Sequence, residues 1–311
     1  MISAAKDSFI ERIRIYNHAL QHSILIDSLL TNIDHNERAR FLRNGLAITG
    51  FNILEDFIKN RIGEVLALIS TSGIDFSRLP ERIQEITLFH SLKGIHVLSQ
   101  RKKDNSEDWK LFIQQETEKI SSTQNTTYQL SPYSIGWDKS NLGKSDIESF
   151  LGHFKVGNVW VNINEISRAI GQTIPFPDQF FQSAGSRRHS AAHNPNALVS
   201  YIDLEAYGLS VKSFAFALDA LLSQSARFII DNDVSYLTTS KKIVHSDIQI
   251  RYIKMVNTSY KEMSANNTTV IGSFPTLAAA VSSLRGRRNY QNEFIVVSDS
   301  ANNLLFWHTG F

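Results

Sequence analysis

The 311-residue sequence contains no cysteine. Disulfide bonds, thiolate catalysis and cysteine-ligated zinc or iron–sulfur sites are therefore excluded. A strong net charge is also lacking, because 32 Lys and Arg residues face 30 Asp and Glu residues. The chain as a whole gives no basic signal for nucleic acid.

No apolar run approaches the roughly eighteen residues that a membrane span needs. Residues 1–14 carry Lys6, Asp7, Glu11 and Arg12 and lack the apolar centre of a secretory signal. We therefore expect a cytoplasmic protein without membrane contact. The composition, with 42% hydrophobic and 20% charged residues, is typical of a globular protein.

The length suits one domain of ordinary size and a smaller one. We predict a helical domain over 1–235, a linker over 236–246 and a small basic α+β domain over 247–311. The stretch 101–143 is poor in apolar residues, and we interpret it as a polar insertion on the side of the helical domain, with a lid or a substrate-facing element as its two candidate roles.

Apolar residues recur at helical intervals through the first 235 residues, which predicts an antiparallel bundle of helices. A capping box over 145–148 opens a short helix. The other predicted helices cover 4–31, 36–70, 80–98, 105–120, 158–170, 178–193 and 209–232.

The pattern changes in the C-terminal piece, where we predict strands and one helix. The strands cover 248–256, 268–271, 294–297 and 304–307, and the helix covers 275–284. Residues 241–311 carry 8 Lys and Arg against 4 Asp and Glu, including a cluster of Arg285, Arg287 and Arg288. A solvated loop is the simpler interpretation of this cluster. Trp307 and Phe311 are expected in a core or an interface.

The segment 185–195 is the candidate for chemistry, because it holds two arginines and two histidines. An arginine fork binds phosphate, and the imidazole suits proton transfer near neutral pH. His189 and His193 are four residues apart and share one face of a helix. Asn194 precedes Pro195, so the helix should end at His193 or Asn194.

The run Arg188-His189-Ser190-Ala191-Ala192-His193 resembles the Arg-polar-x-x-x-His motif of the HEPN superfamily. About residues 1–235 are similar to its RiboL-PSP branch, including the stretches 45–58 and 145–160 and the long apolar helix after the motif. The sequence departs from the family at Asn194, where glycine is frequent, and at His189, where asparagine is commoner.

The resemblance implies a mainly α fold and a metal-independent endoribonuclease without a cofactor. The RNA 2′-OH would attack the adjacent phosphorus and leave 2′,3′-cyclic phosphate and 5′-OH ends. His193 would be the general base or acid, His189 the second proton carrier, and Arg188 would stabilise the phosphoryl oxygens. Arg187 and Asn194 are the candidate substrate-binding residues.

The resemblance also implies partners. HEPN ribonucleases are typically dimers whose two motifs meet, so we expect a homodimer. The expected substrate is tRNA, mRNA or rRNA, and the expected role is that of a toxin or an anti-phage effector, with an antitoxin or another regulatory partner.

Two alternatives remain open at this stage. A HEPN-like bundle can bind RNA or a nucleotide, or serve in assembly, without cutting. A metal-dependent hydrolase could use the pairs His18/His22 and His189/His193, although neither pair contains the internal Glu of H-E-x-x-H. Glu55 and Asp56 could orient the motif or form an acidic solvent face.

Overall fold

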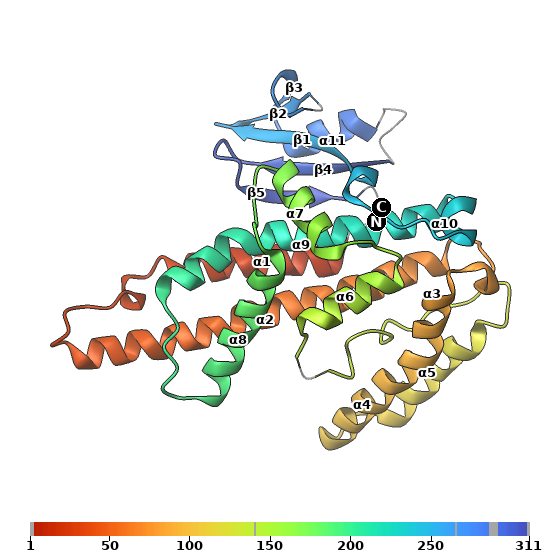
Figure 1. Cartoon of the computed structure of the whole chain (residues 1–311), viewed down its shortest axis with the longest axis horizontal. Helices are drawn as coiled ribbons and strands as arrows, with labels where there is room; N and C mark the ends of the chain where they lie inside the picture. The colour runs from red at the N-terminus through yellow and green to blue at the C-terminus, as the bar shows by residue number, and fades with distance from the viewer. Residues whose placement is uncertain (1–2, 140, 265, 286–291, 310–311) are drawn as a thin grey trace. The chain divides into compact units, whose positions relative to one another are not determined.

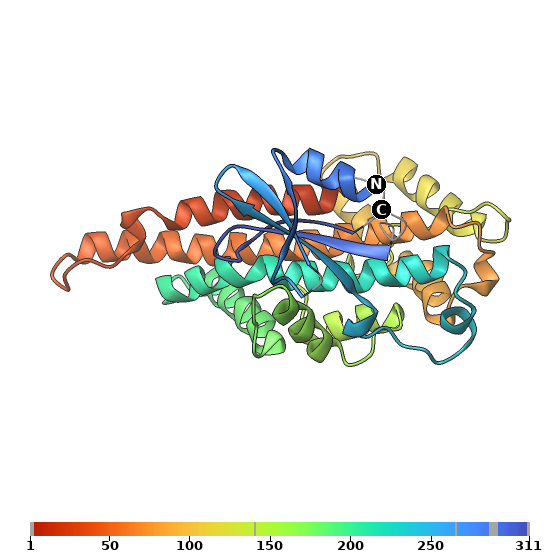
Figure 2. The same ribbon diagram turned by 90° about the horizontal axis from the view of Figure 1, so that it is seen from above.

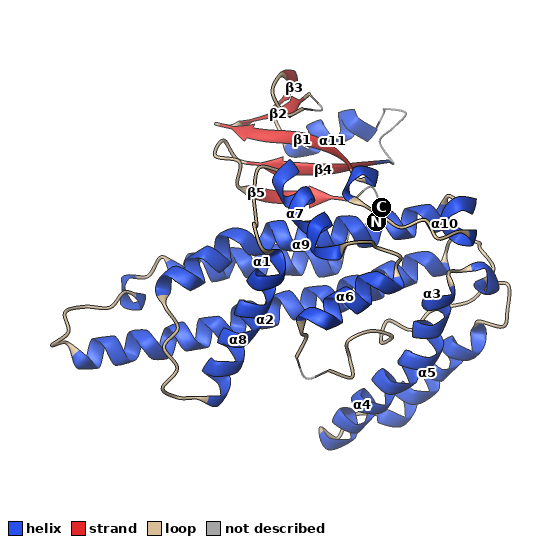
Figure 3. Cartoon of the chain, viewed as in Figure 1, coloured by secondary structure: helices blue, strands red, loops and turns tan. Residues whose placement is uncertain are grey.

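The computed structural model describes residues 3–139, 141–264, 266–285 and 292–309. It is mainly helical, with one small sheet near the C-terminus (Figures 1 and 3), which confirms the predicted fold class. The helices are α1 (Ala4–Leu20), α2 (Ile33–Ser70), α3 (Glu81–Glu85), α4 (Ser91–Asp104), α5 (Trp109–Ser122), α6 (Lys144–His153), α7 (Val159–Ala169), α8 (Pro177–His193), α9 (Tyr201–Ile230), α10 (Val234–Thr238) and α11 (Leu277–Arg285).

The chain divides into two compact units that do not follow the order of the sequence. The first unit comprises residues 1–54, 160–220 and 244–311, and the second comprises 55–159 and 221–243. The long helices α2 and α9, visible along their length in Figure 2, each contribute to both units. The domain boundaries at 235 and 247 stay a prediction.

The prediction of a first helix over 4–31 is wrong beyond Leu20, where α1 ends. The following segment is held by the buried guanidinium of Arg43 in α2, which donates to the Leu25 carbonyl at 2.8 Å and to Asp27 at 2.9 Å. Bonds of this kind compete with the helical backbone ladder. Because the donor lies on another helix, the local pattern does not reveal the end of α1.

Other boundaries also differ from the predictions. Helix α9 begins at Tyr201, eight residues before the predicted start. Helix α10, with Asp233 as its N-cap, spans the start of the predicted linker at residue 236. The predicted capping box at 145–148 is displaced, because the Asp146 carboxylate accepts from the Gly143 N–H at 2.8 Å and α6 starts at Lys144.

Helix α9 is long and apolar enough for a membrane span, the single such helix among the described residues. Its apolar window is 89% buried inside the protein. Core packing therefore accounts for its composition. Phe214, Leu218 and Leu221 of this helix are all buried.

The five described strands form one sheet in the order β3-β2-β1-β4-β5. They are β1 (Gln249–Val256), β2 (Ser259–Met263), β3 (Val270–Phe274), β4 (Glu293–Ser298) and β5 (Leu304–His308). Strands β1 and β4 are parallel and the other pairs antiparallel. Helix α11 covers one face, where Ile253, Ile295 and Val297 pack against Ala280 and Leu284.

Strand β5 joins the sheet to the helices of the first unit through Trp307, which is fully buried. Its indole lies 6.2 Å from the ring of Phe9 in α1 and 6.0 Å from that of Phe216 in α9, between ring centroids. The indole N–H donates to the Asp219 carboxylate at 2.7 Å. Trp307 is thus a core residue, as expected, whereas Arg287, Arg288 and Phe311 lie outside the described residues.

The second unit is built from α3 to α6, α10 and the shared parts of α2 and α9. At its centre, the buried Tyr236 hydroxyl donates to the Phe154 carbonyl at 2.8 Å and lies 2.6 Å from the Ser225 hydroxyl. The stretch 101–143, interpreted as a polar insertion, supplies buried apolar side chains to this unit. They are Phe112, Tyr128, Leu130, Ile135 and Leu142.

Candidate active site

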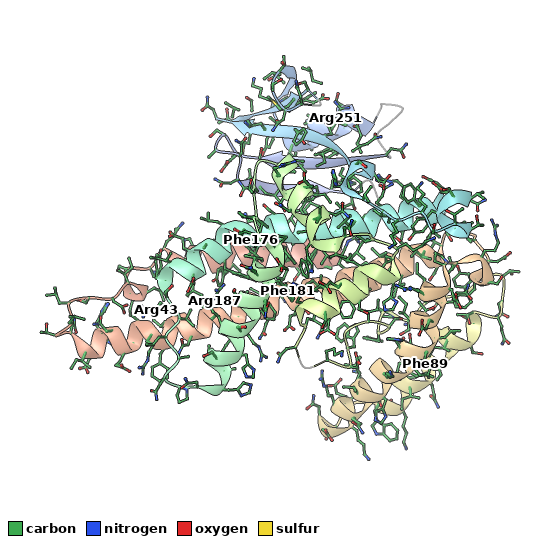
Figure 4. All side chains as sticks on the ribbon, in the orientation of Figure 1. Arg43, Phe89, Phe176, Phe181, Arg187 and Arg251 are labelled. Carbon is green, nitrogen blue, oxygen red and sulfur yellow. The ribbon has the colours of Figure 1, made fainter. Side chains whose placement is uncertain are left out.

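Helix α8 carries the motif and begins at Pro177, the position that tolerates proline because no intrahelical N–H is needed there. Its inner face packs on α2 and α9 through Phe181, whose ring centroid lies 5.3 Å from that of Phe51 and 5.6 Å from that of Phe214. One turn later, a Cβ on Gly185 would come 3.2 Å from the Phe51 ring, so glycine allows this close approach. Figure 4 labels Phe181 on this helix.

The two histidines of the motif come together at the C-terminal end of α8. Both imidazoles are exposed, and their ring centroids are 4.6 Å apart. The helix ends at His193, and Asn194 has an extended backbone, as the Asn-Pro pair predicts. Two proton carriers therefore face solvent at one place.

Arg188 lies beside α2, where its Nε is 3.4 Å from the Asn52 Oδ1. The side chain is partly exposed, and within the described part of the chain no carboxylate pairs with it. Its positive charge is therefore available to an anion. Asn52 was missed as a site residue, although it lies in the stretch 45–58 that carries the family resemblance.

Arg187, a predicted substrate-binding residue, points toward α9. Its guanidinium lies 3.9 Å from the Asp203 carboxylate of α9 and lines a small crevice beside Tyr16 and Tyr207. Burial raises the pKa of the Tyr16 hydroxyl above its usual value, and the charge of Arg187 opposes this rise. Arg187 therefore has an acidic neighbour and a packed environment, and its predicted substrate contact stays a prediction.

The loop after the motif is fixed by two buried polar side chains of α2, Arg43 and Asn44. Arg43, labelled in Figure 4, donates to the Val199 carbonyl at 2.8 Å, and Asn44 donates to the Ala197 carbonyl at 3.0 Å. Asn194 closes the end of α8, because its Oδ1 accepts from the Asn196 N–H at 2.9 Å. The predicted substrate contact of Asn194 stays a prediction.

Glu55 and Asp56 have partners within the second unit. Glu55 is buried and accepts from the Leu142 N–H, and Asp56 accepts from the Asn60 side chain at 2.9 Å. An acidic solvent face is therefore wrong for Glu55.

Within the described ranges, no three His, Asp or Glu side chains gather in a way that could hold a metal ion. The His18/His22 pair on α1 is exposed, with ring centroids 6.1 Å apart. These two imidazoles lie on the surface, and no described Asp or Glu joins them to form a three-ligand group.

Comparison with known proteins shows which family the helical part of the chain resembles. A family model described as RiboL-PSP-HEPN matches residues 7–224, which include all of α8 and the motif. No curated protein and no solved structure matches the chain. The described sheet, from Gln249 onward, lies outside the matched range.

Proposed function

The chain belongs to the RiboL-PSP-HEPN family, and we propose that it is an endoribonuclease that cleaves RNA at the end of α8 without a metal. Membership of the family suggests a nuclease or RNA-related function. One observation supports the finer proposal. The uncompensated guanidinium of Arg188 and two exposed imidazoles, 4.6 Å apart, belong to the same last turns of one helix.

In the proposed reaction, the 2′-OH of RNA attacks the adjacent phosphorus. One imidazole, assigned to His193, takes the 2′-OH proton as the new P–O bond forms. The other, assigned to His189, gives a proton to the 5′-oxygen as its bond to phosphorus breaks. Arg188 stabilises the charge that develops on the phosphoryl oxygens. The products carry a 2′,3′-cyclic phosphate and a 5′-OH.

We further propose that the active form is a homodimer. Large apolar side chains are exposed after the motif, since Leu198 is 81% and Ile202 74% exposed. The turn between α1 and α2 also exposes Leu30 to 94%. Apolar patches of this kind mark protein interfaces. A symmetric pairing through them would bring a second Arg188 and two further imidazoles to one cleft.

The test is to incubate the protein with total RNA and tRNA in EDTA and to map the chemistry of the product ends. We expect cyclic phosphate and 5′-OH ends, and a rate reduced by about 10²- to 10⁴-fold in His193→Ala, the usual contribution of a general acid or base. His18→Ala is the matched control, because His18 is likewise exposed and near another histidine. It should cut at the native rate.

Three results would contradict the proposal. Cleavage abolished by EDTA would require a metal. Equal cleavage of a 2′-deoxy substrate would exclude attack by the sugar hydroxyl. RNA binding without any cleavage would favour the alternative, a non-catalytic RNA- or nucleotide-binding or assembly module.

The proposed biological role is that of a cytoplasmic toxin or anti-phage effector restrained by a regulatory partner such as an antitoxin. It predicts that expression of the native chain arrests growth and that His193→Ala removes the arrest. Arrest of equal strength by the inactive variant would separate toxicity from RNA cleavage.

A further inference from the structure

The second unit contains a cavity of about 460 Å³, within the range of about 300–1,000 Å³ usual for ligand pockets. Its walls come from the start of α3, the turn after α6 and the segment after α10. The last two walls are joined by backbone bonds, since the Ile243 N–H donates to the Lys155 carbonyl at 2.9 Å and the Gly157 N–H to the Ile243 carbonyl at 3.0 Å. Backbone hydrogen bonds therefore hold these two walls of the cavity together.

Three cationic side chains line this cavity, against one carboxylate. The cations are Arg82, Lys155 and Lys242, and the carboxylate is Glu81. Across the residues that the structure describes, Arg82 and Lys242 have no acidic partner. A cavity with such an excess of positive charge attracts an anion.

Lys155 is the cation of this cavity whose ammonium is held in place by hydrogen bonds to the backbone. Its Nζ donates to the carbonyls of Tyr236 and, at 2.7 Å, Thr239, which fixes the ammonium at the cavity. Two of its three N–H groups are used in this way, so one remains for a ligand. Burial lowers the pKa of this ammonium, as expected for a cation that lacks a counter-charge.

The remaining walls suit a ligand with a small carbon skeleton. Pro80, Val156 and Leu237 provide apolar surface, and Thr239 and Ser240 provide hydroxyl groups. None of the residues that line the cavity is aromatic, so there is no ring on which a base could stack. This favours recognition through the anionic group and the hydroxyl-bearing part of a ligand.

We propose that this cavity binds a small organic phosphate, with the phosphoryl group held by Arg82, Lys155 and Lys242 and the carbon skeleton against Pro80, Val156 and Leu237. Guanidinium and ammonium groups are the usual ligands of phosphate. The assignment is independent of the proposed nuclease reaction, since every lining residue belongs to the second unit and the motif to the first.

The experiment is calorimetric titration of the 311-residue chain with ribose 5-phosphate and with ATP, each compared with its uncharged parent, ribose or adenosine. At least one phosphate compound should bind at least tenfold more tightly than its parent. Arg82→Gln and Lys242→Gln should each raise its Kd about tenfold, the equivalent of one charge-assisted hydrogen bond. Both residues are exposed, so the variants should keep the native circular dichroism.

Two further variants sharpen the test. Lys241→Gln is the matched control, because Lys241 neighbours Lys242 but pairs with Asp233 at 2.9 Å and does not line the cavity. It should leave the Kd unchanged. Glu81→Gln removes the one carboxylate of the cavity and should tighten binding of the phosphate.

The proposal is overturned if the phosphates bind no better than their parents or if Lys241→Gln weakens binding as much as Lys242→Gln. It is also overturned if inorganic phosphate binds as tightly as the organic phosphates, because the apolar walls would then contribute nothing. Binding of a 5′-phosphorylated RNA oligonucleotide in place of both small phosphates would assign the cavity to RNA instead. The relative affinities of ribose 5-phosphate and ATP identify the ligand as a sugar phosphate or a nucleotide.

Discussion

Replacing Trp307 should destabilise the first unit strongly, because this side chain fixes the C-terminal sheet to α1 and α9. The indole is fully buried between Phe9 and Phe216, and its N–H donates to Asp219 at 2.7 Å. The Trp307 carbonyl also accepts from the buried Lys6 ammonium at 3.0 Å. Both the side chain and the backbone of Trp307 therefore hold strand β5 against the helices α1 and α9.

The expected magnitude follows from these contacts. Truncation of a buried Trp to Ala costs about 3–5 kcal/mol, and loss of a hydrogen bond to a charged group adds about 1.5–3 kcal/mol. The sum, about 4.5–8 kcal/mol, is comparable to the whole stability of many domains, about 5–15 kcal/mol. Trp307→Phe keeps an aromatic ring and loses the indole N–H, so we expect a cost of about 2–3 kcal/mol.

Urea denaturation followed by circular dichroism measures both changes in the free energy of unfolding. Trp109→Phe is the matched control, because Trp109 is only half-buried at the start of α5 and should cost less than about 1 kcal/mol. If Trp307→Ala also stayed within about 1 kcal/mol of the native chain, the sheet would not be part of this core.

Three further predictions concern single positions. Arg188→Lys keeps the charge but loses the planar fork, so we expect RNA cleavage to fall at least tenfold with unchanged stability, measured by cleavage rate and thermal midpoint. Burial, with a smaller effect of His90, lowers the pKa of His153 from 6.5 to about 4. The unfolded chain therefore binds the additional proton between these values, stability falls as pH drops from 6.5 to 4, and His153→Gln should flatten that part of a urea–pH series. In Gly94→Ala the new Cβ would lie 2.2 Å from the Tyr133 carbonyl oxygen, so denaturation should show a loss of about 1–3 kcal/mol or more.

Much of the helical fold could be predicted because long helices repeat their apolar residues regularly. The stripes of α2 and α9 and the end of α8 at Asn-Pro are local signals of this kind. Strand β2 was missed for a physical reason. Its Glu262 is fully buried and lies 3.6 Å from the Arg251 guanidinium, labelled in Figure 4, so a charged residue occupies a core position. A count of apolar alternation cannot detect that.

The motif could be found from the sequence because its residues are contiguous. The side chains of α2 that position the motif and its following loop could not be found in this way. Arg43 and Asn52 come from α2, more than 130 residues before the groups that they hold, Val199 and Arg188. A polar residue on an amphipathic helix looks the same whether it faces water or a distant carbonyl. The same limit explains why the sequence could not show that Arg187, adjacent to Arg188, lies 3.9 Å from the Asp203 carboxylate.

Asn52 allows a sharp test of what Arg188 contributes. Its amide positions the guanidinium through one partly exposed bond of 3.4 Å without neutralising it, so Asn52→Ala should slow RNA cleavage only about two- to fivefold. Asn52→Asp should hold Arg188 more firmly, yet its carboxylate would compete with the phosphate for the same charge. If the free positive charge is what the reaction uses, Asn52→Asp must be slower than Asn52→Ala in single-turnover cleavage, and the difference must shrink as salt is raised. The opposite order would mean that the orientation of Arg188 matters more than its charge.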